Sequence, residues 1–248
     1  MTQERHFKKY GQIFLKNKAV ATLEARSMDI APGSRVLEIG PGNGILTEQL
    51  LKRGFNVISV ESDHRFVENL YRIFPENIKN GQLTVIKGDF MQYEAGDFDG
   101  IAGNIPYGIS SEILERLTEL NFRCAVLMLQ KEFADRLLAR PGQNGFSRIS
   151  ALSYLNFESK RIRNISAANF YPRPEVTSTI VYLRKKQFKD FSGISAEISR
   201  VFSNKRKKLK NTMKNVPEGL GDLRIEQLSE EDFLRVVKSF TSTRSDRS

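Results

Sequence analysis

The chain has 248 residues, a formal net charge of +10 and a pI near 9.7. This length suits one large domain with a small appendage, and no apolar run reaches the roughly 20 residues of a membrane span. The first residues lack the apolar core of a signal peptide, and one cysteine with two histidines exclude a disulfide framework and a Cys/His zinc site. We therefore expect a cytoplasmic protein without a metal.

Most of the positive charge lies in one segment. Residues 184–214 contain eleven Lys or Arg and two acids, a net charge of +9, so the rest of the chain is nearly neutral. Lys-rich helices are usually only solvated, but a field this concentrated attracts phosphates and predicts an RNA partner. A helix is predicted over 205–214, with its apolar residues packed on the domain and its lysines outward. The candidate RNA-binding residues are Lys205, Lys207, Lys208 and Lys210.

Short β-branched runs alternate with longer amphipathic segments through the first half of the chain. This alternation predicts right-handed βαβ units, a parallel sheet and an α/β fold. The predicted strands are residues 35–39, 56–60, 83–86, 100–102, 124–129 and 178–183. The predicted helices are residues 17–29, 45–53, 63–74, 110–120 and 131–138, with Asn17, Asp63 and either Ser110 or Ser111 as N-caps. Residues 139–157 are interpreted as a Gly-rich loop followed by a mixed apolar segment.

The composition changes abruptly after the last predicted strand. Arg184-Lys185-Lys186 begins the basic segment, and the remaining residues have the pattern of a small helical domain. Two domains are therefore expected, residues 1–186 and residues 187–248. The helices predicted in the second domain are residues 195–203, 205–214 and 230–240.

A glycine-rich turn, Gly40–Gly44, follows the first strand of the sheet. Its glycines let the backbone approach a ligand closely and open a helix N-terminus. Glu61 ends the next strand, where a carboxylate can bind both hydroxyls of a ribose, and Asp89 can reach an adenine amine. The third glycine comes one residue earlier than in the dinucleotide fingerprint, and the adjacent acid Glu38 suits a cationic sulfonium. These features favour S-adenosylmethionine over a nicotinamide cofactor; a turn that serves only packing is the other alternative.

The fourth strand leads into Asn104-Ile105-Pro106-Tyr107, a tetrapeptide suited to gripping a flat heterocycle with an exocyclic amine. The Asn104 side-chain oxygen and the Ile105 carbonyl can both accept hydrogen bonds from one NH₂ group, while Tyr107 stacks on the ring. Phe170 is a candidate for the other face of a flipped base. The alternatives are a Pro-bearing loop after a strand and a core Phe. Because each candidate follows a strand, the carboxyl edge of the sheet is the expected site.

Together these motifs resemble the small-subunit ribosomal RNA adenine dimethyltransferases over nearly the whole chain. The resemblance implies a class I S-adenosylmethionine-dependent methyltransferase, with a Rossmann-like, mainly parallel sheet, an antiparallel last strand and a small C-terminal helical domain. It also implies a substrate of two adjacent adenosines near the 3′ end of small-subunit rRNA, each methylated twice during ribosome biogenesis. The shared motifs are GQIFL (11–15), EIGPGNG (38–44), GD (88–89), NIPY (104–107), QKE (130–132), FYPRPEVTS (170–178) and FSNKRKKLKN (202–211).

The resemblance also assigns roles by position. Residues 1–186 would bind the cofactor and catalyse, residues 187–248 would recognise RNA, and the protein would act as a monomer on the small ribosomal subunit. The family usually has Asn or His at the position of Ile13, so only a backbone or apolar contact remains there. The implied cofactor contacts are Gln12, Ile13, Leu15, Gly40, Gly42, Glu61, Asp89 and Asn104. The implied catalytic residues are Asn104, Ile105 through its backbone, Pro106, Tyr107 and Phe170.

Three other functions stay open at this point. The related antibiotic-resistance methyltransferases act on one adenosine of large-subunit rRNA, although the QKE motif and the basic C-terminal motif favour the small-subunit group. A non-catalytic RNA-binding assembly factor on the same scaffold is a second alternative, which the intact NIPY motif argues against. A nicotinamide oxidoreductase is the third.

Overall fold

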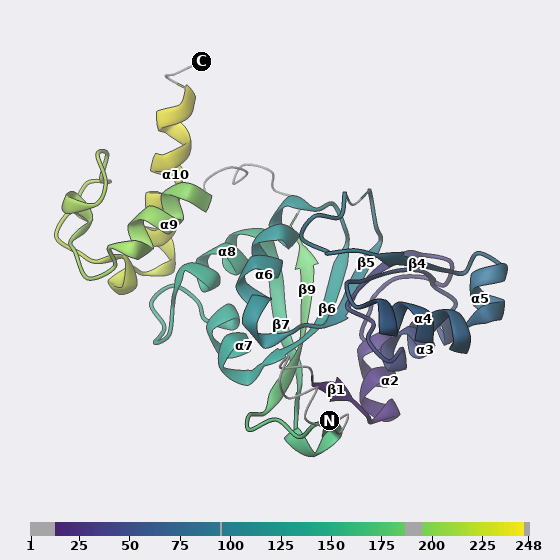
Figure 1. The fold of residues 1–248 in the computed structure, drawn as a ribbon. Coiled ribbons are helices and arrows are strands. Elements are labelled where there is room, and N and C mark those ends of the chain that lie inside the picture. Colours follow the sequence, from purple (N-terminus) through teal and green to yellow (C-terminus); the bar gives the residue numbers. More distant parts are fainter. Residues whose placement is uncertain (1–12, 95, 187–194, 246–248) are drawn as a thin grey trace. The chain divides into compact units, whose positions relative to one another are not determined.

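A computed structural model describes residues 13–94, 96–186 and 195–245 (Figure 1). The chain divides into two compact units: Met1–Ala134 with Ser159–Lys185, and Asp135–Glu158 with Lys186–Ser248. The first unit ends at Lys185, and the domains predicted from the sequence were residues 1–186 and 187–248. Residues 135–158 differ from expectation, because they belong to the second unit rather than to the N-terminal domain.

The first unit is built on a seven-stranded sheet with the order β4-β3-β2-β5-β6-β9-β7. Strands β2 to β6 pair in parallel, and β9 pairs antiparallel to β6, as the resemblance implied. The carboxyl ends of the parallel strands therefore meet at one edge. The strands are β2 (Arg35–Ile39), β3 (Asn56–Glu61), β4 (Leu83–Lys87), β5 (Gly100–Asn104), β6 (Cys124–Gln130), β7 (Phe157–Ile165) and β9 (Ser178–Lys185).

Helices connect the parallel strands, and two of their caps follow directly from the sequence. The Asn17 side chain accepts a hydrogen bond from the Ala19 N–H, and the Asp63 side chain accepts one from the Arg65 N–H, so both predicted N-caps are confirmed. The cap predicted at Ser110 or Ser111 is wrong, because a 3₁₀ turn, η1 (Tyr107–Ile109), runs directly into the helix. The helices are α2 (Lys18–Arg26), α3 (Ile45–Lys52), α4 (His64–Ile73), α5 (Pro75–Lys79), α6 (Ser110–Glu119) and α7 (Lys131–Leu138).

Two further features of the sheet region were not predicted. Strand β7 carries several charges and lies at the edge of the sheet, so the apolar alternation that marks buried strands is weak there. A separate two-stranded sheet joins β1 (Phe14–Leu15) to β8 (Phe170–Tyr171), with Leu15 opposite Phe170. It brings Phe14 and Leu15 beside Phe170 and Tyr171, which lie more than 150 residues later in the sequence. The turn η2 (Ala167–Asn169) links β7 to β8.

The second unit has its own apolar core, formed by its helices and by residues of the turns between them. Phe146 packs edge-on against both Phe202 and Phe233, and Leu209 and Leu228 are fully buried. The presence of Phe146, Ala151, Leu152 and Leu155 in this core explains why residues 135–158 belong to the second unit. Its elements are α8 (Arg148–Asn156), α9 (Ser195–Ser203), η3 (Leu209–Asn211), η4 (Ile225–Gln227) and α10 (Glu230–Ser245).

The helix predicted over 205–214 is wrong. The segment forms turns and the short η3, and its backbone bonds to another segment: the Leu209 N–H donates to the Leu223 carbonyl at 2.8 Å and the Lys210 N–H to the Gly221 carbonyl at 3.1 Å. Leu209 and Met213 are nevertheless buried as predicted. No helix within the described ranges is long and apolar enough to cross a membrane.

Candidate functional site

The glycine-rich turn lies between β2 and α3 and has a backbone that other residues adopt only with strain. Gly42 has a φ of +54°, and a Cβ there would lie 3.3 Å from the Phe14 ring. Gly44, the N-cap of α3, has a φ of +82°, and a Cβ would lie 2.9 Å from the Phe74 ring. The turn therefore needs glycine both for its conformation and for the close approach of neighbouring side chains.

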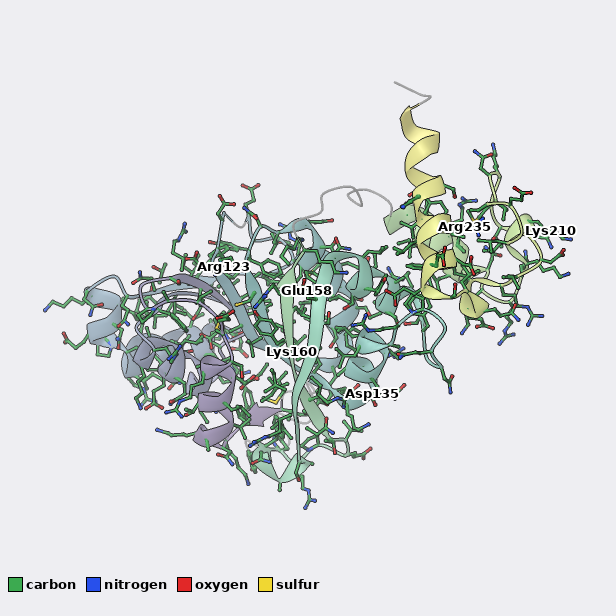
Figure 2. All side chains as sticks on the ribbon, turned by 180° about the vertical axis from the view of Figure 1, so that it is seen from behind. Arg123, Asp135, Glu158, Lys160, Lys210 and Arg235 are labelled. Carbon is green, nitrogen blue, oxygen red and sulfur yellow. The ribbon has the colours of Figure 1, made fainter. Side chains whose placement is uncertain are left out.

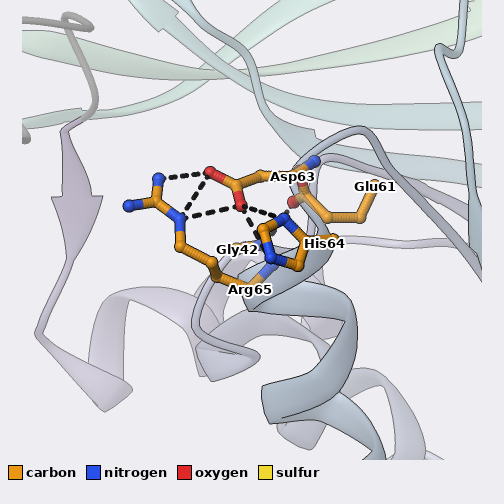
Figure 3. A network of polar contacts seen from close by, with 5 residues as sticks. All are labelled: Gly42, Glu61, Asp63, His64 and Arg65. Carbon is orange, nitrogen blue, oxygen red and sulfur yellow. Dashed lines mark hydrogen bonds and ion pairs between the residues drawn. The ribbon is translucent and has the colours of Figure 1, made fainter.

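Glu61 at the end of β3 fixes this turn (Figure 3). Its side chain is 7% exposed; Oε2 accepts a hydrogen bond from the Gly42 N–H and Oε1 accepts one from the Asp63 N–H, both at 3.0 Å. Each carboxylate oxygen can accept more than one bond, so Glu61 can hold the turn and also bind a ligand. Beside it, Asp63 forms an ion pair with Arg65, and the exposed His64 does not line the cavity described below.

Glu38 has a different role from the one its position beside the turn suggested. It is buried, does not line the cavity, and its Oε2 accepts hydrogen bonds at 2.7 Å from the hydroxyls of Thr47 and Ser59. It therefore ties β2 to α3 and β3. Burial raises the pKa of Glu38 to about 7, although the two hydroxyl bonds oppose that shift. The acid available to a cofactor at this turn is Glu61.

The Asn104-Ile105-Pro106-Tyr107 segment leaves the end of β5 at the same edge of the sheet. The Ile105 N–H donates to the Met128 carbonyl at 3.0 Å, which anchors the segment to β6. The Asn104 side-chain oxygen is buried and has no hydrogen-bond partner among the described residues. The Tyr107 hydroxyl lies 2.9 Å from the Ser178 hydroxyl of β9, and burial raises the pKa of Tyr107 above its usual value, so the phenol stays protonated.

A cavity of about 320 Å³ brings these parts together. The glycine turn and Glu61 line it together with Asn104 and Tyr107, and Phe170, 5% exposed, reaches it from β8. Gln12 lies outside the described residues. The candidates from the sequence that line this cavity are Ile13, Leu15, Gly40, Gly42, Glu61, Asp89, Asn104, Ile105, Pro106, Tyr107 and Phe170.

Sequence reasoning missed several lining residues. Phe14 and Phe66 pack together with ring centroids 5.1 Å apart, and both contribute to the cavity wall, as do Phe90 and Met91 directly after Asp89. Phe14 and Phe90 are neighbours in sequence of the candidates Leu15 and Asp89, and that adjacency could have indicated them. Phe66 on α4 had no such signal. Within the described part of the chain, no three His, Cys, Asp or Glu side chains gather as a metal site would need.

Comparisons with known proteins agree with this geometry. The family model "Ribosomal RNA adenine dimethylase" matches residues 3–241. The chain belongs to this family. A probable ribosomal RNA small subunit methyltransferase A from Methanospirillum hungatei is 36% identical over 221 residues, covering 88% of this chain and 86% of that protein. A ribosomal RNA small subunit methyltransferase A from Borrelia garinii is 37% identical over 253 residues, covering 95% and 89%.

Solved structures show the same fold. A dimethyladenosine transferase from Plasmodium falciparum has a TM-score of 0.80 at 29% identity, covering 93% of this chain and 98% of that one. The 23S rRNA methyltransferase ErmE has a TM-score of 0.72 at 25% identity, covering 91% and 98%. The α/β, Rossmann-like methyltransferase fold expected from the sequence is therefore confirmed.

The buried acids beneath the glycine turn make stability depend on pH. Glu24 on α2 is 1% exposed, and neither of its carboxylate oxygens has a hydrogen-bond partner among the described residues. Burial, and then repulsion from Glu38, raise the pKa of Glu24 well above its ordinary value. The unfolded chain releases these protons at a lower pH than the folded protein does. The resulting stabilisation is therefore fully present below the pKa of the unfolded chain and is lost as pH rises through the pKa of the folded protein.

We predict that Glu24→Gln makes stability less dependent on pH. The other buried acid, Glu38, gives the scale of the effect. Its pKa of about 7 corresponds to a loss of roughly 3 kcal/mol in the free energy of unfolding between pH 4 and 8. Glutamine stays neutral, so urea unfolding from pH 5 to 8 should show a shallower loss for the variant than for the wild type. A stability difference between the two proteins that is the same at every pH would contradict this prediction.

Proposed function

We propose that this protein transfers methyl groups from S-adenosylmethionine to the exocyclic amines of two adjacent adenosines near the 3′ end of small-subunit rRNA, twice on each. The observation that carries the proposal is the buried side-chain oxygen of Asn104, which has no hydrogen-bond partner among the described residues and belongs to a residue that lines the same cavity as Glu61, Asp89 and the glycine turn. A buried acceptor without a partner costs free energy unless a ligand supplies the donor. An amine N–H is such a donor.

The cofactor role is assigned to residues on the β2, β3 and β4 side of the cavity. Gly40 and Gly42 allow the backbone to come close, Glu61 would accept from the ribose hydroxyls, and Asp89 would accept from the adenine amine. Leu15 of β1 and Ile13 directly before that strand add an apolar wall. These residues are acidic or neutral and none is basic, so they suit a sulfonium cation better than a negatively charged pyrophosphate. When bound, the cofactor supplies an electrophilic methyl group.

The residues at the end of β5 would prepare the adenosine amine. Its lone pair is conjugated into the ring and is a weak nucleophile. If Asn104 and the Ile105 carbonyl each accept one N–H bond, the nitrogen is held with its lone pair directed at the methyl group. With the cofactor bound, methyl transfer would replace one N–H bond of the amine by an N–C bond, the released proton would pass to solvent, and the cofactor would leave as a neutral thioether. Tyr107, which stays protonated, and Phe170 would enclose the base. Pro106, directly before Tyr107, would fix the conformation of that loop.

We predict that Glu61→Gln weakens S-adenosylmethionine binding by about tenfold or more, a loss of roughly 1.4 kcal/mol. The amide NH₂ would face the N–H of Gly42 or Asp63, so one bond to the turn becomes a clash of donors. Calorimetry measures the change, with Glu68→Gln as the control, because Glu68 is exposed on α4 and does not line the cavity. Tight binding of NAD with no response to S-adenosylmethionine would contradict the cofactor proposal itself.

We predict that Asn104→Ala lowers turnover about 100- to 1,000-fold while cofactor affinity changes only a few fold. The reason is that the lost acceptor acts on the reacting amine, so the transition state loses more than the ground state. Radiolabelled methyl transfer to undermethylated small subunits, followed by mapping of the modified base, gives both the rate and the target. A variant with near-normal turnover would mean that another group orients the amine.

RNA docking is assigned in part to the basic segment of the second unit, whose lysines form ion pairs. Asp222 binds both Lys208 and Lys210, at 2.9 and 2.7 Å, and Glu226 lies 3.9 Å from Lys205. The hydrogen bonds and charges of these lysines lower the pKa of Asp222 to about 2. Exposed ion pairs contribute little to stability, so phosphates can compete for the lysines.

We predict that changing Lys205, Lys207, Lys208 and Lys210 together to Gln weakens binding to small subunits and flattens its salt dependence, because fewer counterions are released. Asp222→Asn should have the opposite effect, since it removes the competing carboxylate. Cofactor affinity should stay at the wild-type value in both variants. Unchanged salt slopes in both would place the docking surface elsewhere.

The structural likeness to ErmE supports one alternative, methylation of large-subunit rRNA. Mapping the labelled base on both ribosomal subunits separates the two targets. If neither subunit becomes labelled, a non-catalytic assembly factor is favoured. A monomeric state and a cytoplasmic location remain predictions from the sequence.

A further inference from the structure

Strand β7 forms one edge of the seven-stranded sheet and is unusually basic. The strand carries Lys160, Arg161 and Arg163 against one acid, Glu158, and all three cationic residues are exposed. Figure 2 labels Lys160 on this strand; its ammonium lies 4.8 Å from the centre of the Tyr182 ring. The strand therefore adds a local group of exposed cations to a part of the chain that, outside residues 184–214, is nearly neutral.

Edge strands often carry charges simply to prevent pairing with other chains. That explanation applies equally to β4, the other edge of the same sheet, which carries a single cation, Lys87. A protective role therefore does not account for the difference between the two edges. The difference lies in what each edge adjoins.

The basic strand ends beside the cavity. The Asn164 side-chain oxygen near the end of β7 accepts hydrogen bonds at 2.9 Å from the Thr179 hydroxyl at the start of β9 and from Arg161. The neighbouring Ser178 lines the cavity, and the chain reaches Phe170, also in the cavity wall, five residues after Ile165. Arg161 and Arg163 are two residues apart and both are exposed, on either side of the partly buried Ile162.

Exposed apolar side chains gather on the segments that form the cavity rim. Of the five large apolar residues that are exposed in the described part of the chain, Ile109 lines the cavity, Tyr171 follows Phe170, and Val176 lies two residues before Ser178. Tyr171 is 48% exposed, and the exposed Arg173 follows it closely. Aromatic rings and cations beside one another are the usual means of holding single-stranded nucleic acid.

We propose that Arg161 and Arg163 of β7, together with the exposed Tyr171 and Arg173 that follow the cavity-lining Phe170, form the surface that holds the RNA strand next to the target adenosine. The arginines would bind successive phosphates, and Tyr171 would stack on a base adjacent to the one in the cavity. This inference rests on the proposed function. It adds a contact within the catalytic unit that is independent of the lysines of the second unit.

The test compares two double variants with equal loss of charge. Arg161→Gln with Arg163→Gln removes the proposed contacts; Arg72→Gln with Lys79→Gln removes two exposed cations from α4 and α5, beside β4. Binding of each protein to a fluorescent hairpin RNA with two adjacent loop adenosines, and to undermethylated small subunits, is measured at several salt concentrations. The β7 variant should bind both about tenfold more weakly, with a salt slope lower by roughly 0.7 per phosphate. The control should match the wild type.

The rim aromatic is tested separately. Tyr171→Ala should raise KM for the RNA about tenfold with kcat nearly unchanged, and Tyr171→Phe should restore the wild-type value, because stacking needs only the ring. Equal salt slopes for the β7 variant and its control would overturn the proposal. So would a loss of binding to subunits with unchanged binding to the protein-free hairpin, which would assign the strand to a ribosomal protein. A wild-type enzyme that transfers no methyl group would instead contradict the proposed function.

Discussion

The hydrogen bonds of one carboxylate organise the whole site. Glu61 accepts N–H bonds from Gly42 and from Asp63, and it thereby joins the turn after β2, the end of β3 and the start of α4. None of these three backbone segments is fixed by apolar packing alone, because each lies at the edge of the sheet where the core ends. Charge-assisted bonds are stronger than neutral ones, so a single buried acid can hold the cavity wall in place.

Much of the first unit was predictable because local and long-range signals agree there. The β-branched strands, the Asn17 and Asp63 caps and the glycine turn each specify the same βαβ arrangement, and parallel strands bring their carboxyl ends together. That rule predicts Glu61 and Asn104 at the same edge of the sheet, and both residues line the cavity there. The roles of these residues in binding and catalysis remain predictions.

The remaining errors have a common physical origin, since each depends on contacts with distant segments. Nothing in the local pattern shows that Glu38 points to Thr47 and Ser59 instead of to a ligand. The helical spacing of Leu209 and Met213 correctly indicated burial. However, the backbone there bonds to residues 221–223, so the segment buries its apolar residues without forming a helix. Strand β7 was missed because an edge strand needs little apolar alternation.

Glu24 and Asn104 both carry buried oxygens without a hydrogen-bond partner among the described residues, and the consequences differ. The oxygens of Glu24 lie among core residues, and a raised pKa lets that side chain avoid an unpaired charge by staying protonated. The Asn104 side chain cannot respond in this way, because an amide does not titrate in this pH range. The desolvation cost of its oxygen therefore persists in the ligand-free protein. A fold retains such a group only where other contacts hold it in place. Here the Ile105–Met128 backbone bond next to Asn104 provides such a constraint, and Asn104 is among the residues that line the cavity, where a ligand could supply the missing donor.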